Sequence, residues 1–513
     1  MTTLLDWRLA CAPLALLATI ATAEAQGKGD AAACSALQSL TLDRFDLKVE
    51  SAAHVTEGAP HCLLSGSIEN REGVGGKPYA IGFAIALPDE WTGRLLFQGG
   101  GGLNGLVRPP LGAAAAGERS ALERGFAVIS NDSGHKGENS FDPSFKEDQI
   151  AVLNFSHASV EKVTLLAKEI AAAYYDQPAA RSYFAGCSTG GREAMTAAQR
   201  YPELFDGIIA GAPAMRTNYS NLSLAWKAVE MSRISPKGDD GKPDRSKAFS
   251  DADRQVVLDG ILKACDGLDG AEDGMIFDTK GCSFDPAALV CQAGSTNACI
   301  TAEQAQVVKA AFAPLTDTTG RERYVSFPAD TGVNVNDDNA IPGLLRFDRP
   351  RNRQARNLAT EFDVEKEIDK LTADPQQQLI NSDNWTDLGS YAGKGGKLIF
   401  FHGMSDPWFS ANDTVDYFAR MDAATGKKTP TDEWARLYLV PGMAHCRGGP
   451  GALDQFDLLT SLVDWVEEGK APAAVTATGA AFPDRSRPLC PYPSHAQYAG
   501  SGDMEKAESF SCK

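Results

Sequence analysis

The chain has 513 residues, a net charge of −18 and 43% hydrophobic residues. It is longer than a single compact core usually allows, which indicates one extended domain that carries an insertion. The strongly acidic balance argues against nucleic acids and anionic membrane surfaces as partners. No feature of the sequence indicates an obligatory protein partner.

The N-terminus has the pattern of an export signal. Arg8 directly precedes the apolar stretch LACAPLALLATIATA, and small residues at positions 21, 23 and 25 offer cleavage sites. The apolar run is too short and too poorly flanked for a membrane anchor, so residues 1–25 are predicted to be a signal peptide. Of the eleven cysteines, only Cys11 lies within it, which leaves ten. An even number of cysteines in an exported chain suggests disulfides, and we expect a secreted or periplasmic protein.

Short apolar runs alternate with helical patterns along most of the chain. The strand candidates are residues 79–88, 94–98, 125–130, 182–186, 206–213, 397–403 and 436–442. The helix candidates are residues 159–175, 190–200, 410–424 and 453–468. This repetition of strand, helix and strand predicts a parallel sheet covered by helices on both faces.

The alternation stops between residues 214 and 390, where the chain is polar and contains four cysteines. We interpret this segment as a lid inserted into the sheet domain, with residues 327–358 as its least structured part. The predicted organisation is therefore a sheet domain built from residues 26–213 and 391–513, interrupted by a lid domain over residues 214–390.

Residues 186–190, GCSTG, match the pattern G-x-S-x-G. In an α/β-hydrolase this pattern forms a sharp turn from strand to helix that exposes a nucleophilic serine. With 49 glycines in the chain the motif alone is weak, but here a strand candidate precedes it and a helix candidate follows it. The sequence therefore predicts an α/β-hydrolase fold with a large inserted lid domain, and Ser188 as its nucleophile.

Three histidines follow the serine, and one of them is favourably placed. In α/β-hydrolases the acid and then the histidine come after the nucleophile. His445 lies on a loop just after a strand candidate, whereas His402 ends a strand candidate and His495 lies in a tail rich in proline and cysteine. Asp406 follows the strand candidate before His445, where the acid belongs. We therefore predict a triad of Ser188, Asp406 and His445 that acts through an acyl-enzyme.

Cysteines stand next to both the predicted nucleophile and the predicted base. Cys187 precedes Ser188, and Cys446 follows His445. If the hydroxyl and the imidazole meet at about 2.6–3.2 Å, the neighbouring Cα atoms can lie within the roughly 4.4–6.8 Å that a disulfide needs. We predict a Cys187–Cys446 bridge that fixes the geometry of nucleophile and base. The alternative is two unrelated structural cysteines.

The segments GCSTGG, HGMSDPWFS and PGMAHCRGGPG together resemble the tannase and feruloyl esterase family of α/β-hydrolases. In that family a cysteine beside the serine is bridged to a cysteine beside the histidine. The resemblance implies a carboxylesterase that hydrolyses small esters of hydroxycinnamic or hydroxybenzoic acids. Trp408 and Phe409, beside Asp406, either stack on such an aromatic group or pack in the core.

Two other functions stay open. The family includes mono(2-hydroxyethyl) terephthalate hydrolase, so an aromatic monoesterase of that kind is the alternative. An arginine of the lid would then bind the free carboxylate, and the candidates are Arg346, Arg349, Arg351, Arg353 and Arg356. A more remote alternative is an inactive binding protein with a hydrolase fold, although the sequence shows no broken triad.

The glycine-rich run FQGGGGLNG, residues 97–105, ends a strand candidate. Glycines allow backbone N–H groups to approach a developing oxyanion closely. One oxyanion donor should be the N–H of Thr189, the residue after the nucleophile. The second should come from this glycine loop, and the resemblance assigns it to Gly102.

The run CDGLDGAEDGMIFD, residues 265–278, places three aspartates in one glycine-rich turn. Hard oxygen ligands at short spacing suit Ca²⁺, although the spacing alone is equally typical of a solvated acidic loop. The resemblance implies a structural calcium ion in the lid, bound by Asp266, Asp269, Ala271, Asp273 and Met275. Proximity and the resemblance also imply four further disulfides: Cys34–Cys62, Cys265–Cys282, Cys291–Cys299 and Cys490–Cys512.

Overall fold

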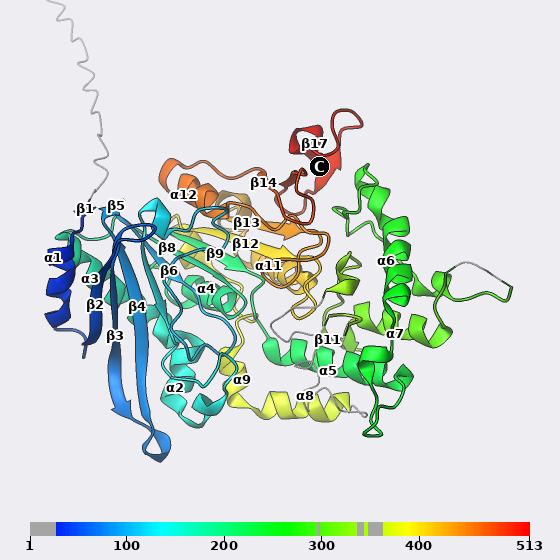
Figure 1. The fold of residues 1–513 in the computed structure, drawn as a ribbon, viewed down its shortest axis with the longest axis horizontal. Helices are drawn as coiled ribbons and strands as arrows, with labels where there is room; N and C mark the ends of the chain where they lie inside the picture. The colour runs from blue at the N-terminus through cyan, green and yellow to red at the C-terminus, as the bar shows by residue number, and fades with distance from the viewer. Residues whose placement is uncertain (1–26, 295–297, 336–342, 347–362) are drawn as a thin grey trace, which may run out of the picture.

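A computed structural model describes residues 27–294, 298–335, 343–346 and 363–513 (Figure 1). The predicted signal peptide lies outside these residues, and so do four of the candidate lid arginines, Arg349, Arg351, Arg353 and Arg356. None of the helices in the described ranges is long and apolar enough to cross a membrane.

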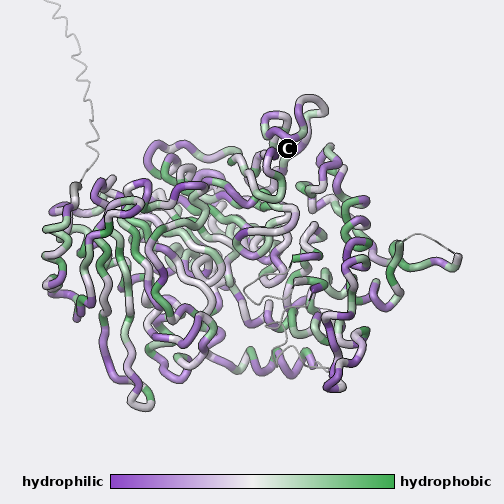
Figure 2. Tube along the Cα trace, viewed as in Figure 1, coloured by the Kyte–Doolittle hydropathy of each residue, from purple (hydrophilic) through white to green (hydrophobic). Residues whose placement is uncertain are grey.

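The centre of the molecule is a nine-stranded sheet, and six neighbouring strands of it are parallel. In spatial order these six are β13 (Ala435–Val440), β12 (Lys397–Gly403), β9 (Gly207–Gly211), β8 (Arg181–Cys187), β6 (Arg94–Gln98) and β7 (Ala127–Asn131). Apolar residues follow these strands through the interior (Figure 2). Parallel strands covered on both faces need apolar side chains at successive positions, which explains why the short apolar runs of the sequence mark them.

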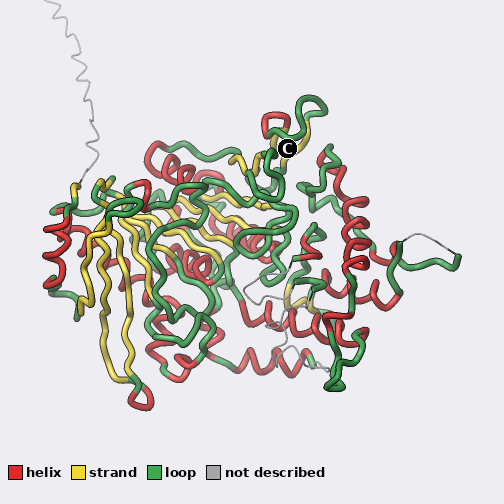
Figure 3. Tube along the Cα trace, viewed as in Figure 1, coloured by secondary structure: helices red, strands yellow, loops and turns green. Residues whose placement is uncertain are grey.

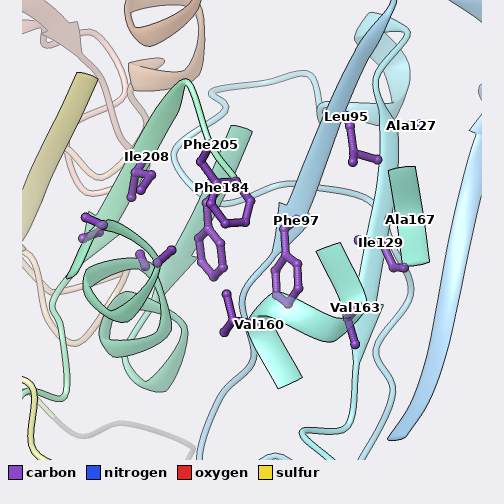
Figure 4. Close-up of a cluster of buried hydrophobic side chains, with 14 of the residues drawn as sticks. Leu95, Phe97, Ala127, Ile129, Val160, Val163, Ala167, Phe184, Phe205 and Ile208 are labelled. Carbon is purple, nitrogen blue, oxygen red and sulfur yellow. The ribbon is translucent and has the colours of Figure 1, made fainter. Parts of the chain in front are cut away.

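Helices cover both faces of the sheet. On one face pack α3 (Ser159–Tyr175), α4 (Thr189–Arg200) and α11 (Ala411–Thr425), and on the other packs α12 (Leu458–Glu468). The rings of Phe97 and Phe184 stack at 4.8 Å between their centroids, and Val160 and Val163 of α3 lie beside them (Figure 4). The predicted α/β-hydrolase fold is confirmed.

The expectation of a wholly parallel sheet is wrong at one edge. There β2 (Lys48–Val55), β3 (His61–Glu72) and β4 (Pro78–Pro88) run antiparallel, and β4 joins them to β7. The sequence revealed only β4 of these three strands. Strand β2 lies at the edge of the sheet and is largely exposed, so it needs no apolar run, and its polar sequence KVESAAHV gave no signal.

The predicted lid is mainly helical (Figure 3) and lies beside the sheet (Figure 1). Its elements are α5 (Thr217–Ile234), α6 (Asp251–Cys265), α7 (Ala302–Phe312), the pair β10 (Leu315–Thr316) and β11 (Glu322–Tyr324), α8 (Val364–Ala373) and α9 (Pro375–Ile380). All of these elements except α9 contribute to a hydrophobic cluster whose buried members run from Leu222 to Ile368. Leu379 and Ile380 of α9 pack instead against a smaller cluster that includes Phe145 and Phe155. The remaining short elements are β1 (Gly27–Lys28), α1 (Ala31–Ala36), β5 (Glu90–Trp91), α2 (Gln149–Leu153), α10 (Gly389–Gly393), β14 (Val475–Ala477), β15 (Arg487–Leu489), β16 (Ala496–Tyr498) and β17 (Phe510–Cys512).

Ten cysteines form five disulfides, with Cα–Cα distances between 4.9 and 5.9 Å. They are the five pairs expected from the sequence: Cys34–Cys62, Cys187–Cys446, Cys265–Cys282, Cys291–Cys299 and Cys490–Cys512. Disulfides of this number are typical of proteins that fold in an oxidising compartment.

Candidate active site

Ser188 lies in a sharp turn between β8 and α4. Its backbone has φ 65° and ψ −123°, a conformation that non-glycine residues adopt only when the surrounding structure enforces it. The N–H of Ser188 donates to the carbonyl of Gly211 at 3.0 Å. A Cβ atom added to Gly186 would lie 2.7 Å from the backbone of Gly190, so the turn has no room for side chains at that point. The local geometry is that of a nucleophile turn.

Asp406 and His445 come from the ends of two neighbouring strands and meet. Asp406 follows β12 and His445 follows β13, and Asp406 Oδ2 lies 2.6 Å from His445 Nδ1. The carboxylate therefore holds the proton on Nδ1 and leaves Nε2 as the acceptor of the ring. Nε2 is buried and has no hydrogen-bond partner among the described residues, so it is available to a serine hydroxyl.

Four groups surround the buried carboxylate of Asp406. The N–H groups of Trp408 and Phe409 donate to Oδ1 at 2.9 and 3.1 Å, and His402 Nε2 lies 3.4 Å from Oδ2. Burial alone would raise the pKa of Asp406, but the charge of His445 and the hydrogen bonds from His402 and His445 bring it well below its usual range. Asp406 is thus ionised at neutral pH and can stabilise an imidazolium ion.

The contact between His402 and Asp406 was not expected from the sequence. His402 is fully buried, and its ring nitrogens also lie 2.8 Å from Thr414 Oγ1 and 3.0 Å from the carbonyl oxygen of Phe409. A histidine at the end of a strand, four residues before the acid, is the signal that would have drawn attention to it.

The Cys187–Cys446 disulfide connects the turn of Ser188 to the loop of His445. Its Cα atoms are 5.9 Å apart. Cys446 has φ 68°, a second unfavourable backbone conformation next to a predicted catalytic residue. The bridge therefore limits how far the serine and the histidine can separate.

The glycine loop from Gly99 to Gly105 lies against the first turn of α4. Thr189 Oγ1 donates to the carbonyl of Gly102 at 2.5 Å, and the N–H of Gly190 donates to the carbonyl of Gly100 at 3.1 Å. Among the described residues, every backbone N–H of this loop has a hydrogen-bond acceptor except those of Gly101 and Gly102. The unpaired donor of Gly102 fits the oxyanion role expected for it.

Three aromatic rings, those of Trp408, Phe409 and Phe141, flank this site. The Trp408 ring lies 5.6 Å from the ring of His445 and 6.2 Å from that of Phe141. Trp408 Nε1 donates to Asn221 Oδ1 of α5 at 2.9 Å, which connects the ring to the predicted lid. Phe141 is 46% exposed and lies next to Gly102, whereas Phe409 is buried. The Phe409 ring lies 5.1 Å from the ring of His445, so this buried residue packs against the predicted base.

The acidic loop of the predicted lid holds its aspartates in different ways. Asp269 is buried and accepts the N–H groups of Ala271 and Phe277, both at 3.1 Å, and within the described ranges it makes no ion pair. Burial raises its pKa to about 7. Asp273 pairs with the buried guanidinium of Arg487. No three acidic, histidine or cysteine side chains of the described chain are grouped closely enough to form a metal site by themselves.

Comparisons with known proteins agree on a single family. The model of the tannase and feruloyl esterase family matches residues 66–513. The mono(2-hydroxyethyl) terephthalate hydrolase of Piscinibacter sakaiensis is 36% identical over 525 residues, covering 90% of this chain and 86% of that protein. The probable feruloyl esterase B-1 of Aspergillus flavus is 32% identical over 456 residues, covering 83% of this chain and 82% of that protein.

A solved structure extends the similarity to three dimensions. The crystal structure of feruloyl esterase B from Aspergillus oryzae has a TM-score of 0.75 and 25% sequence identity, and the match covers 94% of this chain and all of that one. The family model, the curated relatives and this structure all span most of the chain. The chain therefore belongs to the tannase and feruloyl esterase family.

Proposed function

We propose that this protein is a secreted serine esterase that hydrolyses esters of hydroxycinnamic or hydroxybenzoic acids through an acyl-enzyme. One observation carries the proposal. His445 Nδ1 lies 2.6 Å from Asp406, its Nε2 has no partner among the described residues, and a disulfide joins its neighbour to the neighbour of Ser188. Acyl transfer by serine needs such a base, already oriented and close to the hydroxyl.

The proposed reaction assigns one role to each group. His445 Nε2 takes the proton of Ser188 Oγ as the oxygen attacks the ester carbonyl, and Asp406 stabilises the resulting imidazolium ion. The N–H groups of Thr189 and Gly102 donate to the oxyanion. His445 then gives its proton to the leaving alcohol. A water molecule, activated in the same way, releases the acid and restores the serine hydroxyl.

The substrate class follows from the rings beside the triad. An aromatic acyl group held next to Ser188 can pack against Trp408 and Phe141, and covering the exposed Phe141 ring would be favourable. Two proteins to which the chain is similar carry the name feruloyl esterase.

The terephthalate monoester is not favoured as the substrate. That alternative needs a lid arginine for the free carboxylate, and four of the five candidates lie outside the described residues. The fifth, Arg346, is partly buried.

A substrate panel tests the proposed function. We expect kcat/KM for methyl ferulate or methyl gallate to exceed that for mono(2-hydroxyethyl) terephthalate at least tenfold, because the free carboxylate of the terephthalate monoester would lose hydration against the rings of Trp408 and Phe141. A preference for the terephthalate monoester would restore the alternative. Absence of turnover on every ester, including p-nitrophenyl acetate, would favour an inactive binding protein.

We also propose a structural calcium ion at the acidic loop, held by the carboxylates and carbonyls predicted from the sequence. The donors are hard oxygens, and the carboxyl of Asp269 is buried without a cationic partner in the described structure, which a bound cation would supply. The pairing of Asp273 with Arg487 fits less well, since Asp273 would share its charge between the two cations. The ion would stabilise the lid and take no part in the reaction.

Removal of calcium is expected to destabilise the protein. An ion that binds only the native state adds stability by mass action, so EDTA should lower Tm by several degrees and added calcium should restore it. Asp269→Asn should lower Tm and abolish the response to calcium. Asp317→Asn is the matched control, because Asp317 is a buried lid aspartate paired with Arg323 instead. That variant should lose stability and keep the calcium response. Purified protein without calcium, and with the same Tm in EDTA, would contradict the site.

A further inference from the structure

Glu193 is a fully buried carboxylate on α4, five residues after Ser188. Its Oε2 accepts the N–H of Gly100 at 2.8 Å, and its Oε1 accepts Asn104 Nδ2 at 2.8 Å. Both oxygens therefore accept a hydrogen bond from the glycine loop, one on each side of Gly101 and Gly102, whose N–H groups are unpaired among the described residues. Burial raises the pKa of Glu193, while the charge of Arg192 and the donated hydrogen bonds oppose that rise.

The same carboxylate also connects the loop to the end of β7. Ser133 Oγ donates to Glu193 Oε1 at 3.3 Å and contacts Asn104 Nδ2. The N–H of Ser133 in turn donates to Asn131 Oδ1 at 2.7 Å, and Asn131 is the last residue of β7. Three segments that are distant in sequence thus meet at the side chain of Glu193. The helix that carries Glu193, α4, begins directly after Ser188.

The glycine loop has little freedom between these contacts. A Cβ atom added to Gly99 would lie 2.7 Å from the Cα of Gly190, so the backbones of the loop and of α4 are in direct contact. Asn104 itself has φ 50° and donates its N–H to the carbonyl of Gly101 at 3.0 Å. A shift of Asn104 would therefore move the peptide units of Gly101 and Gly102, where the unpaired donors lie.

We propose that Glu193 is a positioning residue that fixes the glycine loop relative to Ser188, so that the N–H of Gly102 lies where the oxyanion forms. The inference rests on the proposed esterase function and extends it. A carboxylate suits this position because it accepts hydrogen bonds at both oxygens, whereas an amide accepts at only one. An oxyanion donor is effective only when its geometry is set in advance.

Glu193→Gln tests the hydrogen-bond pattern with almost no change in shape. If the amide nitrogen faces the N–H of Gly100, two donors oppose each other. If it faces Asn104, the Asn104 amide must turn over to offer its oxygen, and its nitrogen is then buried where Oδ1 now lies without a partner. We expect kcat for p-nitrophenyl acetate to fall about thirtyfold, which is a smaller fall than removal of a whole oxyanion donor causes. KM should change less than about twofold. The Ki of phenylboronic acid, whose adduct with serine places a hydroxyl in the oxyanion site, should rise in parallel.

A second substitution should restore the pattern. In the double variant Glu193→Gln/Asn104→Asp, the glutamine oxygen accepts from Gly100 and its nitrogen donates to the new carboxylate, so each group again has a complementary partner. Asn104→Asp alone places two carboxylates together and should lower kcat as well. The double variant is expected to regain most of the lost kcat, which simple loss of packing would not allow.

Gln199→Ala is the matched control. Gln199 is a buried side chain of the same helix, and it donates to the carbonyls of Ser382 and Trp385, not to the glycine loop. Its removal should lower Tm yet leave kcat and the phenylboronic acid Ki within about twofold of the original values. If Glu193→Gln does not fold, Ser133→Ala replaces it in the test. We expect Ser133→Ala to lower kcat about threefold, to leave KM unchanged and to bind phenylboronic acid more weakly.

Two results would overturn the inference. In the first, Glu193→Gln lowers Tm but keeps the original kcat and phenylboronic acid Ki, or Ser133→Ala does so in its place. The contact of Glu193 with the loop would then be structural only. A double variant no better than Glu193→Gln would exclude the hydrogen-bond pattern as the cause. Ser188→Ala separates this failure from that of the proposed function. If Ser188→Ala keeps its activity, the esterase assignment itself fails, whereas an inactive Ser188→Ala beside an unaffected Glu193→Gln rejects only the role of Glu193.

Discussion

Ser188→Ala is expected to lower kcat for methyl ferulate by about 10⁵-fold or more, because acyl transfer loses its nucleophile. The fold should be unaffected. Within the described structure Ser188 Oγ makes no hydrogen bond, so no contact is lost with it. Alanine meets the same backbone constraint at φ 65° as serine does. The measurement is kcat together with Tm and far-UV circular dichroism.

Ser182→Ala is the control for this variant. Ser182 is a buried serine of the same strand, β8, at its opposite end. Its substitution should leave kcat near the original value. Activity of Ser188→Ala within tenfold of the original enzyme would remove Ser188 from the mechanism, whatever the geometry around it.

The double variant Cys187→Ala/Cys446→Ala is expected to lose about a hundredfold in kcat with little change in KM. The bridge holds the segments of Ser188 and His445 with Cα atoms 5.9 Å apart, and a displacement of about 1 Å between reacting groups can cost this much. Stability should fall too, since the bridge closes a loop with a sequence separation of 259. Loop entropy alone gives an upper value of roughly 5 kcal/mol.

Assay temperature separates these two effects. Well below the Tm of the variant, nearly all molecules are folded, so a remaining loss of kcat reflects geometry. Cys34→Ala/Cys62→Ala is the matched control, because that bridge joins α1 to β3 at the far edge of the sheet. It should lower Tm and leave kcat unchanged. If the Cys187→Ala/Cys446→Ala variant matches the original kcat at low temperature, the bridge only adds stability.

The fold explains how three residues so distant in sequence come to lie at one edge of the sheet. Strands β8, β12 and β13 are parallel, so their C-terminal ends lie at the same edge of the sheet. Ser188, Asp406 and His445 each follow one of these ends. The proposed triad could therefore be assigned from the sequence alone, because short apolar runs identify buried parallel strands and the chain order of the three residues follows the fold class.

The supporting contacts were not predictable in the same way. Glu193 lies 93 residues from Gly100 along the chain, and a glutamate within a helix pattern carries no signal of a partner in a distant loop. Arg487 pairs with Asp273 across 214 residues, so the spacing of the acidic loop could not show that one of its aspartates already has a cation. Such contacts depend on the packing of the whole fold, which local periodicity does not encode.

The most direct test of the account is covalent labelling of the nucleophile. The intact protein is treated with diisopropyl fluorophosphate, reduced and digested with trypsin, and the peptide of residues 182–192 is sequenced by mass spectrometry. We predict one adduct, located at Ser188 and not at Ser182, whose formation parallels the loss of esterase activity and which is absent from Ser188→Ala. An adduct at another serine, or full loss of activity with residue 188 unmodified, would contradict the account.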